Sequence, residues 1–175
     1  MRKVEVKDGK VYLNNRPVYQ RLILDQGYWP DSLLTPPSDE ALRQDVQYTL
    51  DFGYNGARKH QKLEDPRYYY WADKMGLLVW GEVPSTYDFT SDSVQNLTET
   101  LMAFIQRDYN HPCIITWVPM NESWGIWQTY ANPQQQALAR MLYHLTKAAD
   151  GTRLCSSNDG WEQVETDICA LHDYA

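Results

Sequence analysis

Cysteine, phenylalanine and long apolar runs are scarce in this sequence. Only three cysteines occur among 175 residues, without a Cys-x-x-Cys or His-x-x-x-His spacing, which favours buried free thiols over a disulfide framework or a metal cluster. No apolar stretch reaches membrane length, and Met1 to Glu5 lacks the apolar core of a signal peptide. The chain as given is therefore expected to be soluble and without a membrane partner. If the chain is a piece of a longer protein, the N-terminus of that protein lies elsewhere and its localisation stays open.

A basic patch is also lacking. The formal net charge is -7, from 16 Lys and Arg against 23 Asp and Glu, and both signs are scattered along the chain. Nucleic acid is therefore not an expected partner. Thirteen Tyr and seven Trp stand against three Phe, and rings with a polar group suit stacking on sugar faces as well as ordinary packing.

The order of the expected elements is that of a parallel α/β protein. Alternation around Asp8-Gly9 predicts a β-hairpin over 4–13. Helices then alternate with strands, which predicts a parallel sheet. Strands are expected at 18–24, 54–58, 77–83, 114–118, 153–157 and 166–174, and helices at 38–52, 65–75, 91–108 and 132–149. A complete (β/α)₈ barrel takes about 250 residues, more than this chain has, so the residues alone predict one parallel α/β domain over 1–175.

The strand expected at Ile114–Val118 ends just before an amide and a carboxylate, Asn121 and Glu122. In a parallel barrel the carboxyl ends of the strands form the active face, so these side chains are expected there and not in the core. Flanking rings, Trp117 and Trp124, are expected to solvate Glu122 poorly and to raise its pKa, as suits a general acid. The alternative is that Asn-Glu only begins a loop.

Two ordered stretches resemble glycoside hydrolase family 2, the β-galactosidases, β-glucuronidases and β-mannosidases. The first match contains the motifs Arg-x-x-Asn-His-Pro, Ile-Ile-x-Trp and Asn-Glu-Ser. The second match lies earlier in the chain and contains Asn-x-x-Arg and then a strand ending in Glu. They stand in Phe104 to Gly125, FIQRDYNHPCIITWVPMNESWG, in Asn55 to Arg58, NGAR, and in Tyr70 to Glu82, YWADKMGLLVWGE. The resemblance covers about Val4 to Tyr174. It implies an incomplete TIM barrel of about six β/α units with an N-terminal hairpin, from a family that hydrolyses β-glycosides with retention.

The resemblance implies roles for particular residues. Glu122 would protonate the leaving oxygen and later deprotonate water, and Arg58 would orient the nucleophilic carboxylate. Tyr174 falls near a tyrosine that hydrogen-bonds the nucleophile. The family's histidine after the arginine is displaced by one place, at His60, and in extended chain such a shift reverses the side chain's direction.

Further site residues are expected around Glu122. Substrate contacts are predicted for Asn121, Trp117, Trp124 and Asp25, and Glu82 either contacts substrate or supports a neighbour. Asn158 and Trp161 also hint at the polarity of the pocket. The family's magnesium-binding Glu-x-His has no counterpart at Thr86-Tyr87-Asp88, so neither a metal nor another cofactor is predicted.

The resemblance also implies that a catalytic residue is missing. The family takes its nucleophilic Glu from the seventh strand, and none of Glu162, Glu165, Asp167 and Asp173 has the family's sequence context. The chain is therefore expected to be a truncated, nearly inactive piece of a retaining β-glycosidase, and open sheet edges predict a homo-oligomer. The alternatives are another barrel glycosidase, such as a cellulase-like one, and a non-catalytic carbohydrate-binding or interaction module. The sugar is not determined.

Overall fold

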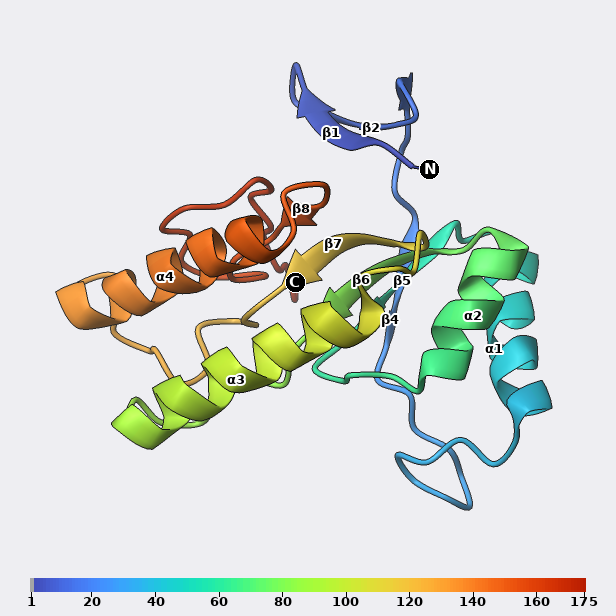
Figure 1. The fold of residues 1–175 in the computed structure, drawn as a ribbon, viewed down its shortest axis with the longest axis horizontal. Coiled ribbons are helices and arrows are strands. Elements are labelled where there is room, and N and C mark those ends of the chain that lie inside the picture. Colours follow the sequence, from blue (N-terminus) through green and yellow to red (C-terminus); the bar gives the residue numbers. More distant parts are fainter. Residues whose placement is uncertain (1) are drawn as a thin grey trace.

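The computed structural model describes residues 2–175, which form one five-stranded parallel sheet, four helices and a small antiparallel sheet (Figure 1). The parallel strands are β4 (Leu22–Asp25), β5 (Gly56–Lys59), β6 (Leu78–Glu82), β7 (Ile114–Val118) and β8 (Leu154–Cys155). The helices are α1 (Asp39–Asp51), α2 (Pro66–Met75), α3 (Ser91–Asp108) and α4 (Pro133–Ala149). No helix within residues 2–175 is long and apolar enough to cross a membrane.

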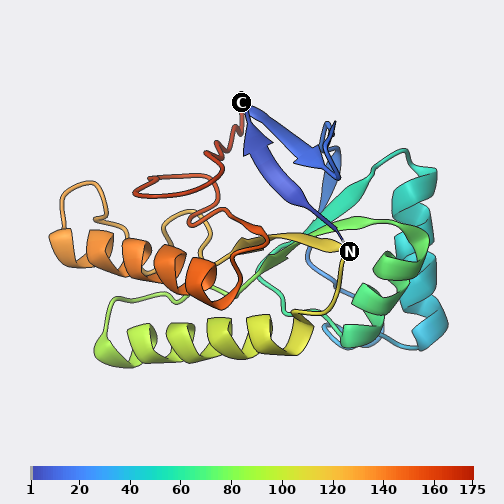
Figure 2. The same cartoon turned by 45° about the horizontal axis from the view of Figure 1, so that its top comes forward.

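The parallel strands follow one another in sequence order, β4-β5-β6-β7-β8. The four helices pack against one face of this sheet, and the hairpin lies on the other (Figure 2). A doubly wound sheet would instead reverse its strand order and carry helices on both faces. Sequential order with helices outside is the construction of a barrel wall. The predicted α/β fold, an incomplete TIM barrel, is therefore confirmed.

The predicted N-terminal hairpin is also confirmed. Strands β1 (Val4–Lys7) and β2 (Lys10–Leu13) pair antiparallel, and β3 (Arg16–Pro17) continues the sheet. Asp8 and Gly9 turn the chain with φ of 50° and 70°, the left-handed conformation that a two-residue hairpin loop requires. Val4 packs with Trp80 and Ile115 on the face of the parallel sheet opposite the helices, so the hairpin covers part of the inner face of the barrel wall.

Side-chain caps fix where the helices begin. Ser38 accepts a hydrogen bond from the Ala41 amide, and Thr90 accepts one from Ser93, ahead of α1 and α3. Asp65 and Asn132 cap α2 and α4, each followed by a proline in the first turn. These are the residue types that best satisfy the free amides of a first turn. Capping therefore explains why the predicted helix starts agree with the structure.

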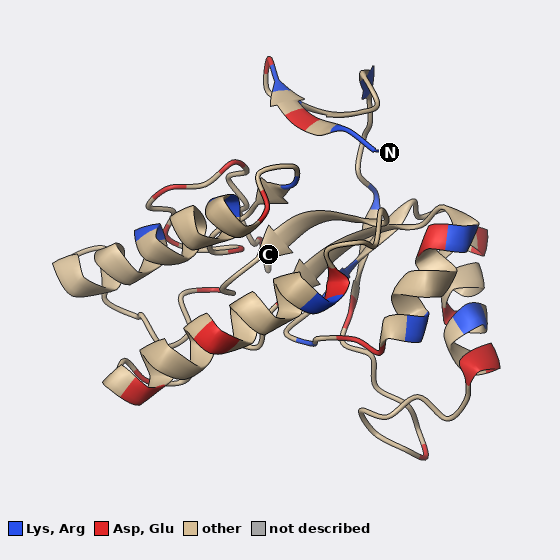
Figure 3. Ribbon diagram, viewed as in Figure 1, with Lys and Arg blue, Asp and Glu red and all other residues tan. Residues whose placement is uncertain are grey.

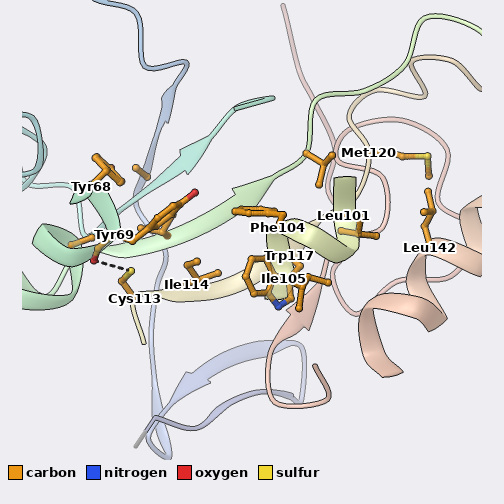
Figure 4. Packing of buried hydrophobic residues seen from close by; sticks show 14 of the residues in the cluster. Tyr68, Tyr69, Leu101, Phe104, Ile105, Cys113, Ile114, Trp117, Met120 and Leu142 are labelled. Carbon is orange, nitrogen blue, oxygen red and sulfur yellow. Dashed lines mark hydrogen bonds between the residues drawn. The ribbon is translucent and has the colours of Figure 1, made fainter. Parts of the chain in front are cut away.

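The main core lies between the sheet and the helices (Figure 4). Trp117 of β7 packs edge-on against Phe104 of α3, with ring centroids 5.0 Å apart, in the geometry that aromatic pairs prefer. Acidic and basic residues are both distributed along the helices and the connecting segments (Figure 3). The thiols of Cys113 and Cys155 are free and buried, as predicted, but Cys169 is free and exposed, so the prediction of burial is wrong for that residue.

The segment 166–174, predicted as a sixth strand, forms no strand. Its Asp167 amide bonds to the Cys155 carbonyl at 2.9 Å, but the Asp167 carboxylate takes the Cys155 amide, also at 2.9 Å. The Asp167 side chain thus accepts the hydrogen bond of the Cys155 backbone amide, which a neighbouring strand would otherwise accept through its carbonyl groups. The chain instead runs as an irregular segment that brings its last residues over the carboxyl ends of the strands.

Part of the Asn-His-Pro motif is structural. His111 Nδ1 lies 2.7 Å from Asp73 Oδ2, and the other oxygen of Asp73 accepts the Cys113 amide at 2.7 Å. Arg107 Nη2 donates to the Glu64 carbonyl at 2.7 Å. These contacts attach the end of α3 and the start of β7 to α2 and its preceding loop. The motif therefore positions β7, and through it the residues that follow β7.

Candidate active site

Arg58, at the end of β5, lies at the centre of a buried polar network. Its Nε is 2.6 Å from Glu82 Oε2 at the end of β6, and its Nη1 is 2.8 Å from Asp159 Oδ2 beyond β8. Its Nη2 donates to Asn121 Oδ1 at 2.5 Å, beyond β7. All five guanidinium donors lie in one planar fork, so a single side chain fixes groups from three neighbouring strand ends.

Glu122 follows Asn121 at the carboxyl edge and is partly buried. Its Oε1 lies 2.6 Å from His172 Nδ1 and also accepts the Tyr174 hydroxyl. Its amide donates to the Asp159 carbonyl at 2.9 Å. Glu122 and Ser123 both have left-handed backbones, with φ of 49° and 56°. Non-glycine residues seldom adopt this conformation, and when they do they cluster at functional sites.

The pKa of Glu122 is lowered, whereas the sequence predicted a raised one. Burial raises it, but the hydrogen bonds from His172 and Tyr174 and the charges of His172 and Arg58 together outweigh burial. The prediction was wrong because it counted on poor solvation by flanking tryptophans. Trp117 points to the opposite face of the sheet, and the Glu122 carboxylate instead contacts the hydrogen-bonding groups of His172 and Tyr174.

Glu82 supports Arg58 and does not reach the cavity surface. Its side chain is fully buried, Oε2 pairs with Arg58, and Oε1 accepts the Gln61 amide at 3.0 Å. Burial raises the pKa of Glu82 to about 7, against the opposing effect of Arg58. Of the two roles left open for Glu82, the structure favours the supporting one, and the predicted direct substrate contact is corrected.

Trp117 and Asp25 are not brought to the site. Asp25, Lys59, Gly81 and Trp117 are in register across the sheet, and in parallel strands such residues share a face. That face is the helix side: Trp117 is buried in the core, and Asp25 pairs with buried Lys59 at 2.6 Å. Arg58 and Glu82 occupy the other face, since each is one residue out of step, so the predictions for Trp117 and Asp25 are corrected.

The remaining predicted residues lie near Glu122 in different ways. Asn121 is buried; its backbone amide donates to Ser85 Oγ at 3.1 Å, and within residues 2–175 its side-chain Nδ2 makes no hydrogen bond. Tyr174 is exposed, with its hydroxyl on Glu122. Trp124 packs edge-on against Tyr87, with ring centroids 5.4 Å apart. Asn158 stabilises the loop after β7, because its Oδ1 accepts a hydrogen bond from the Ser123 amide at 2.9 Å.

Sequence reasoning missed two site residues, His172 and Asp159. His172 bridges Glu122 and Asp159: Nδ1 lies 2.6 Å from Glu122, and Nε2 lies 3.1 Å from Asp159 Oδ2. Gly160 permits this approach, because a Cβ there would lie 2.6 Å from His172 Nδ1. Asp159-Gly160 after a predicted strand was a signal for a turn at the carboxyl edge, but His172 fell in a segment assigned to a strand.

A cavity of about 430 Å³ opens above Glu122, and we call it the acid cavity. In this cavity the Glu122 carboxylate faces a guanidinium, a phenol and two imidazoles. The lining residues are Leu24, Gln26, Arg58, His60, Glu122, Leu171, His172, Asp173 and Tyr174. Its volume falls within the range of small-molecule sites. Among residues 2–175 no group of three His, Cys, Asp or Glu side chains is arranged to hold a metal ion. An ionisable carboxylate with neighbouring donors in a cavity is an arrangement suited to proton transfer.

Comparison with known proteins agrees with a partial barrel. The sequence profile of "Glycosyl hydrolases family 2, TIM barrel domain" matches residues 4–175. The chain therefore belongs to glycosyl hydrolase family 2.

Relatives with curated names include a β-galactosidase of Vibrio cholerae, 30% identical over 183 aligned positions, which cover 98% of this chain and 17% of that protein. A β-glucuronidase of Streptococcus agalactiae is 28% identical over 142 positions, covering 70% of this chain and 23% of that protein. The chain thus spans less than a quarter of the length of either relative.

Solved structures of similar fold include a putative β-galactosidase from Bacteroides fragilis, with a TM-score of 0.80, 24% identity, and coverage of 95% of this chain and 24% of that chain. Bacteroides uniformis β-glucuronidase 2, covalently bound to cyclophellitol-6-carboxylate aziridine, gives a TM-score of 0.76 at 28% identity, covering 89% of this chain and 20% of that one. Both likenesses agree with the barrel wall described above.

Proposed function

We propose that this chain carries the general acid/base half of a retaining β-glycosidase site, with Glu122 as the proton donor and acceptor. The observation that carries the proposal is the position of Glu122 at the carboxyl edge, in the acid cavity, with His172 and Tyr174 on its Oε1. The names of its relatives, β-galactosidase and β-glucuronidase, support a β-glycoside as substrate.

Glu122 would act twice in such a reaction. In the first step the protonated carboxyl gives its proton to the leaving oxygen, and in the second the carboxylate takes a proton from water. The donors around it lower its pKa in this chain, which suits the second step. A second carboxylate about 5 Å away, as retaining sites require, would raise it and suit the first step. The side-chain Nδ2 of Asn121, which makes no hydrogen bond within residues 2–175, would hold a sugar hydroxyl.

We further propose that the nucleophilic carboxylate comes from outside residues 1–175. Near Glu122, Glu82 and Asp159 are both bound to Arg58. Of the later acids, Glu162 Oε2 accepts a hydrogen bond from Ser123 Oγ at 2.5 Å, and Asp167 pairs with Lys147 at 2.8 Å. Asp173 lines the acid cavity and makes no ion pair within residues 2–175. None of Glu162, Glu165, Asp167 and Asp173 has the sequence context of the family's nucleophile, so we expect the chain alone not to turn over.

Hydrolysis of a panel of nitrophenyl β-glycosides tests this proposal. The chain alone should show sugar binding without turnover. Addition of a separate segment supplying the three remaining β/α units of an eight-stranded barrel should produce activity on one sugar of the panel and so identify that sugar. Full activity of the 175-residue chain alone would show that the nucleophile is already present, and would overturn the assignment.

Association through the open edges of the sheet is a second proposal. Within residues 2–175, strands β4 and β8 each have a partner on one side only, and unpaired strand edges promote pairing with another chain. We expect sedimentation velocity to show concentration-dependent dimers or larger oligomers. The barrel-completing segment should reduce this association by covering an edge. Monomers throughout the concentration range would contradict the proposal.

A further inference from the structure

A second cavity lies beside the acid cavity, and nothing described so far assigns it a role. We call it the tyrosine cavity: it measures about 590 Å³ and lies between the loops that follow β4, β5 and β6. Gln26 and His60 line both cavities, and Gln26 Nε2 lies 2.9 Å from His60 Nδ1. This hydrogen-bonded pair therefore forms the common wall of two adjoining cavities.

The lining of the tyrosine cavity offers no unpaired charge. Lys62 is its one ammonium group among the described residues, and Nζ donates to the carbonyls of Gly27 at 2.6 Å and Leu34 at 2.9 Å. The same Nζ pairs with Glu64 at 3.2 Å. An anion entering the cavity would lose its hydration without gaining a free counterion, which is costly.

His60 adds to this neutral character. Burial and the nearby charge of Arg58 lower the pKa of His60, so its imidazole is neutral at neutral pH. No carboxylate lines the cavity within residues 2–175. The polar groups that remain are the amide, hydroxyl and imidazole groups of Gln26, Gln61, Ser85 and His60, which match the hydroxyls of an uncharged sugar.

Two exposed tyrosines stand at the rim of the cavity. Tyr28 and Tyr87 are 65% and 80% exposed, so their rings are available to a ligand. Trp124 packs edge-on against Tyr87, and Trp127 packs against Trp124 with centroids 4.6 Å apart. An aromatic ring fixed by its neighbours stacks at low entropy cost on a flat partner such as the apolar face of a pyranose.

We propose that the tyrosine cavity binds a second, uncharged sugar unit, so that the substrate of this site is a neutral β-linked disaccharide or longer glycan. This inference rests on the proposed glycosidase function and extends it from the bond cleaved to the length and charge of the substrate. One unit would occupy the acid cavity next to Glu122, and its neighbour would cross the Gln26–His60 wall and stack at Tyr87.

Sugar binding by the full 175-residue chain tests the proposal without need for turnover. The affinities of lactose, cellobiose and β-mannobiose would be compared by ¹⁵N NMR with those of the methyl β-glycosides of their single units, and with a disaccharide that carries a uronic acid. We expect one neutral disaccharide to bind roughly three- to tenfold more tightly than its methyl glycoside, from the added stacking, and to shift the amides of Ser85 and Tyr87.

Tyr87→Ala should abolish this difference and leave the affinity for the methyl glycoside unchanged. Tyr130→Ala is the matched control, because Tyr130 is also exposed and lines neither cavity. Equal affinity for one and two sugar units, or equal binding of the acidic disaccharide, would overturn the proposal. Disaccharide binding at Tyr87 without hydrolysis in the completed barrel would refute the proposed glycosidase function but support the sugar site in the tyrosine cavity. Hydrolysis without a preference for the disaccharide would support the glycosidase function and refute that sugar site.

Discussion

Replacement of Glu122 by Gln is expected to lower turnover of nitrophenyl β-glycosides in the completed barrel by about 100- to 10,000-fold, the usual contribution of a general acid/base. Gln keeps the size of the side chain and can still accept the Tyr174 hydroxyl, but it neither gives nor takes a proton. The measurement is kcat and KM of both forms. Because positioning is retained, the loss should fall on kcat.

The leaving group and a small anion identify the step that is lost. A good leaving group needs little protonation, so the first step should survive in Glu122→Gln, and azide, which needs no general base, should restore the second step. Glu99→Gln, on the surface of α3, serves as the matched control and should retain full activity. An unchanged kcat in Glu122→Gln would show that Glu122 is not the general acid/base. Failure of azide to restore turnover would indicate that Glu122 positions the substrate and does not transfer a proton.

Replacement of Arg58 by Met is expected to lower the free energy of unfolding by about 3–5 kcal/mol, the cost of removing one partner of a buried ion pair. Met matches the apolar stem of Arg58 but leaves Glu82 and Asp159 without their cation, although both are buried. The pKa of Glu82 is already raised to about 7 by burial, and the loss of Arg58 would raise it further. Urea unfolding curves at neutral pH measure the effect.

The size of the loss should depend on pH. At acid pH Glu82 is protonated in the variant, so its buried charge disappears and part of the lost stability returns. Arg43→Met is the matched control, since Arg43 pairs with Glu40 on the surface, and its stability should be nearly unchanged. A loss in Arg58→Met no larger than in this control would show that Arg58 does not hold the network together.

Local patterns sufficed for the fold. Apolar runs, helix caps and the Asp8-Gly9 turn predict the hairpin, five strands and four helices, because each depends on residues close in sequence. The segment 166–174 escaped this reasoning. Its apolar spacing favoured a strand, but the Asp167 carboxylate bonds to the Cys155 amide and to Lys147. Such a contact between distant residues is not encoded in a local pattern.

The site was predictable only in part, for a similar reason. Glu122 and Arg58 stand at strand ends that the sequence marks clearly. Which face of a strand a residue occupies depends on a one-residue step, so Trp117 and Asp25 were assigned to the site although they turn to the helices. His172 reaches Glu122 across 50 positions of sequence, and only the folded chain shows that contact. The pKa direction of Glu122 was missed with it.

The left-handed pair Glu122 and Ser123 carries a cost that the rest of the chain must meet. Each non-glycine residue held there costs of order 1–3 kcal/mol, while a domain's whole margin of stability is about 5–15 kcal/mol. Hydrogen bonds from the two amides to Asp159 and Asn158 oppose that cost. Glycine at either position would relieve the strain. At 122 it would remove the carboxylate that we propose as the acid/base, and at 123 it would remove the hydroxyl that contacts Glu162 and Asn158. On the proposed assignment, the stability of the chain and the position of its acid/base therefore place opposite demands on this dipeptide.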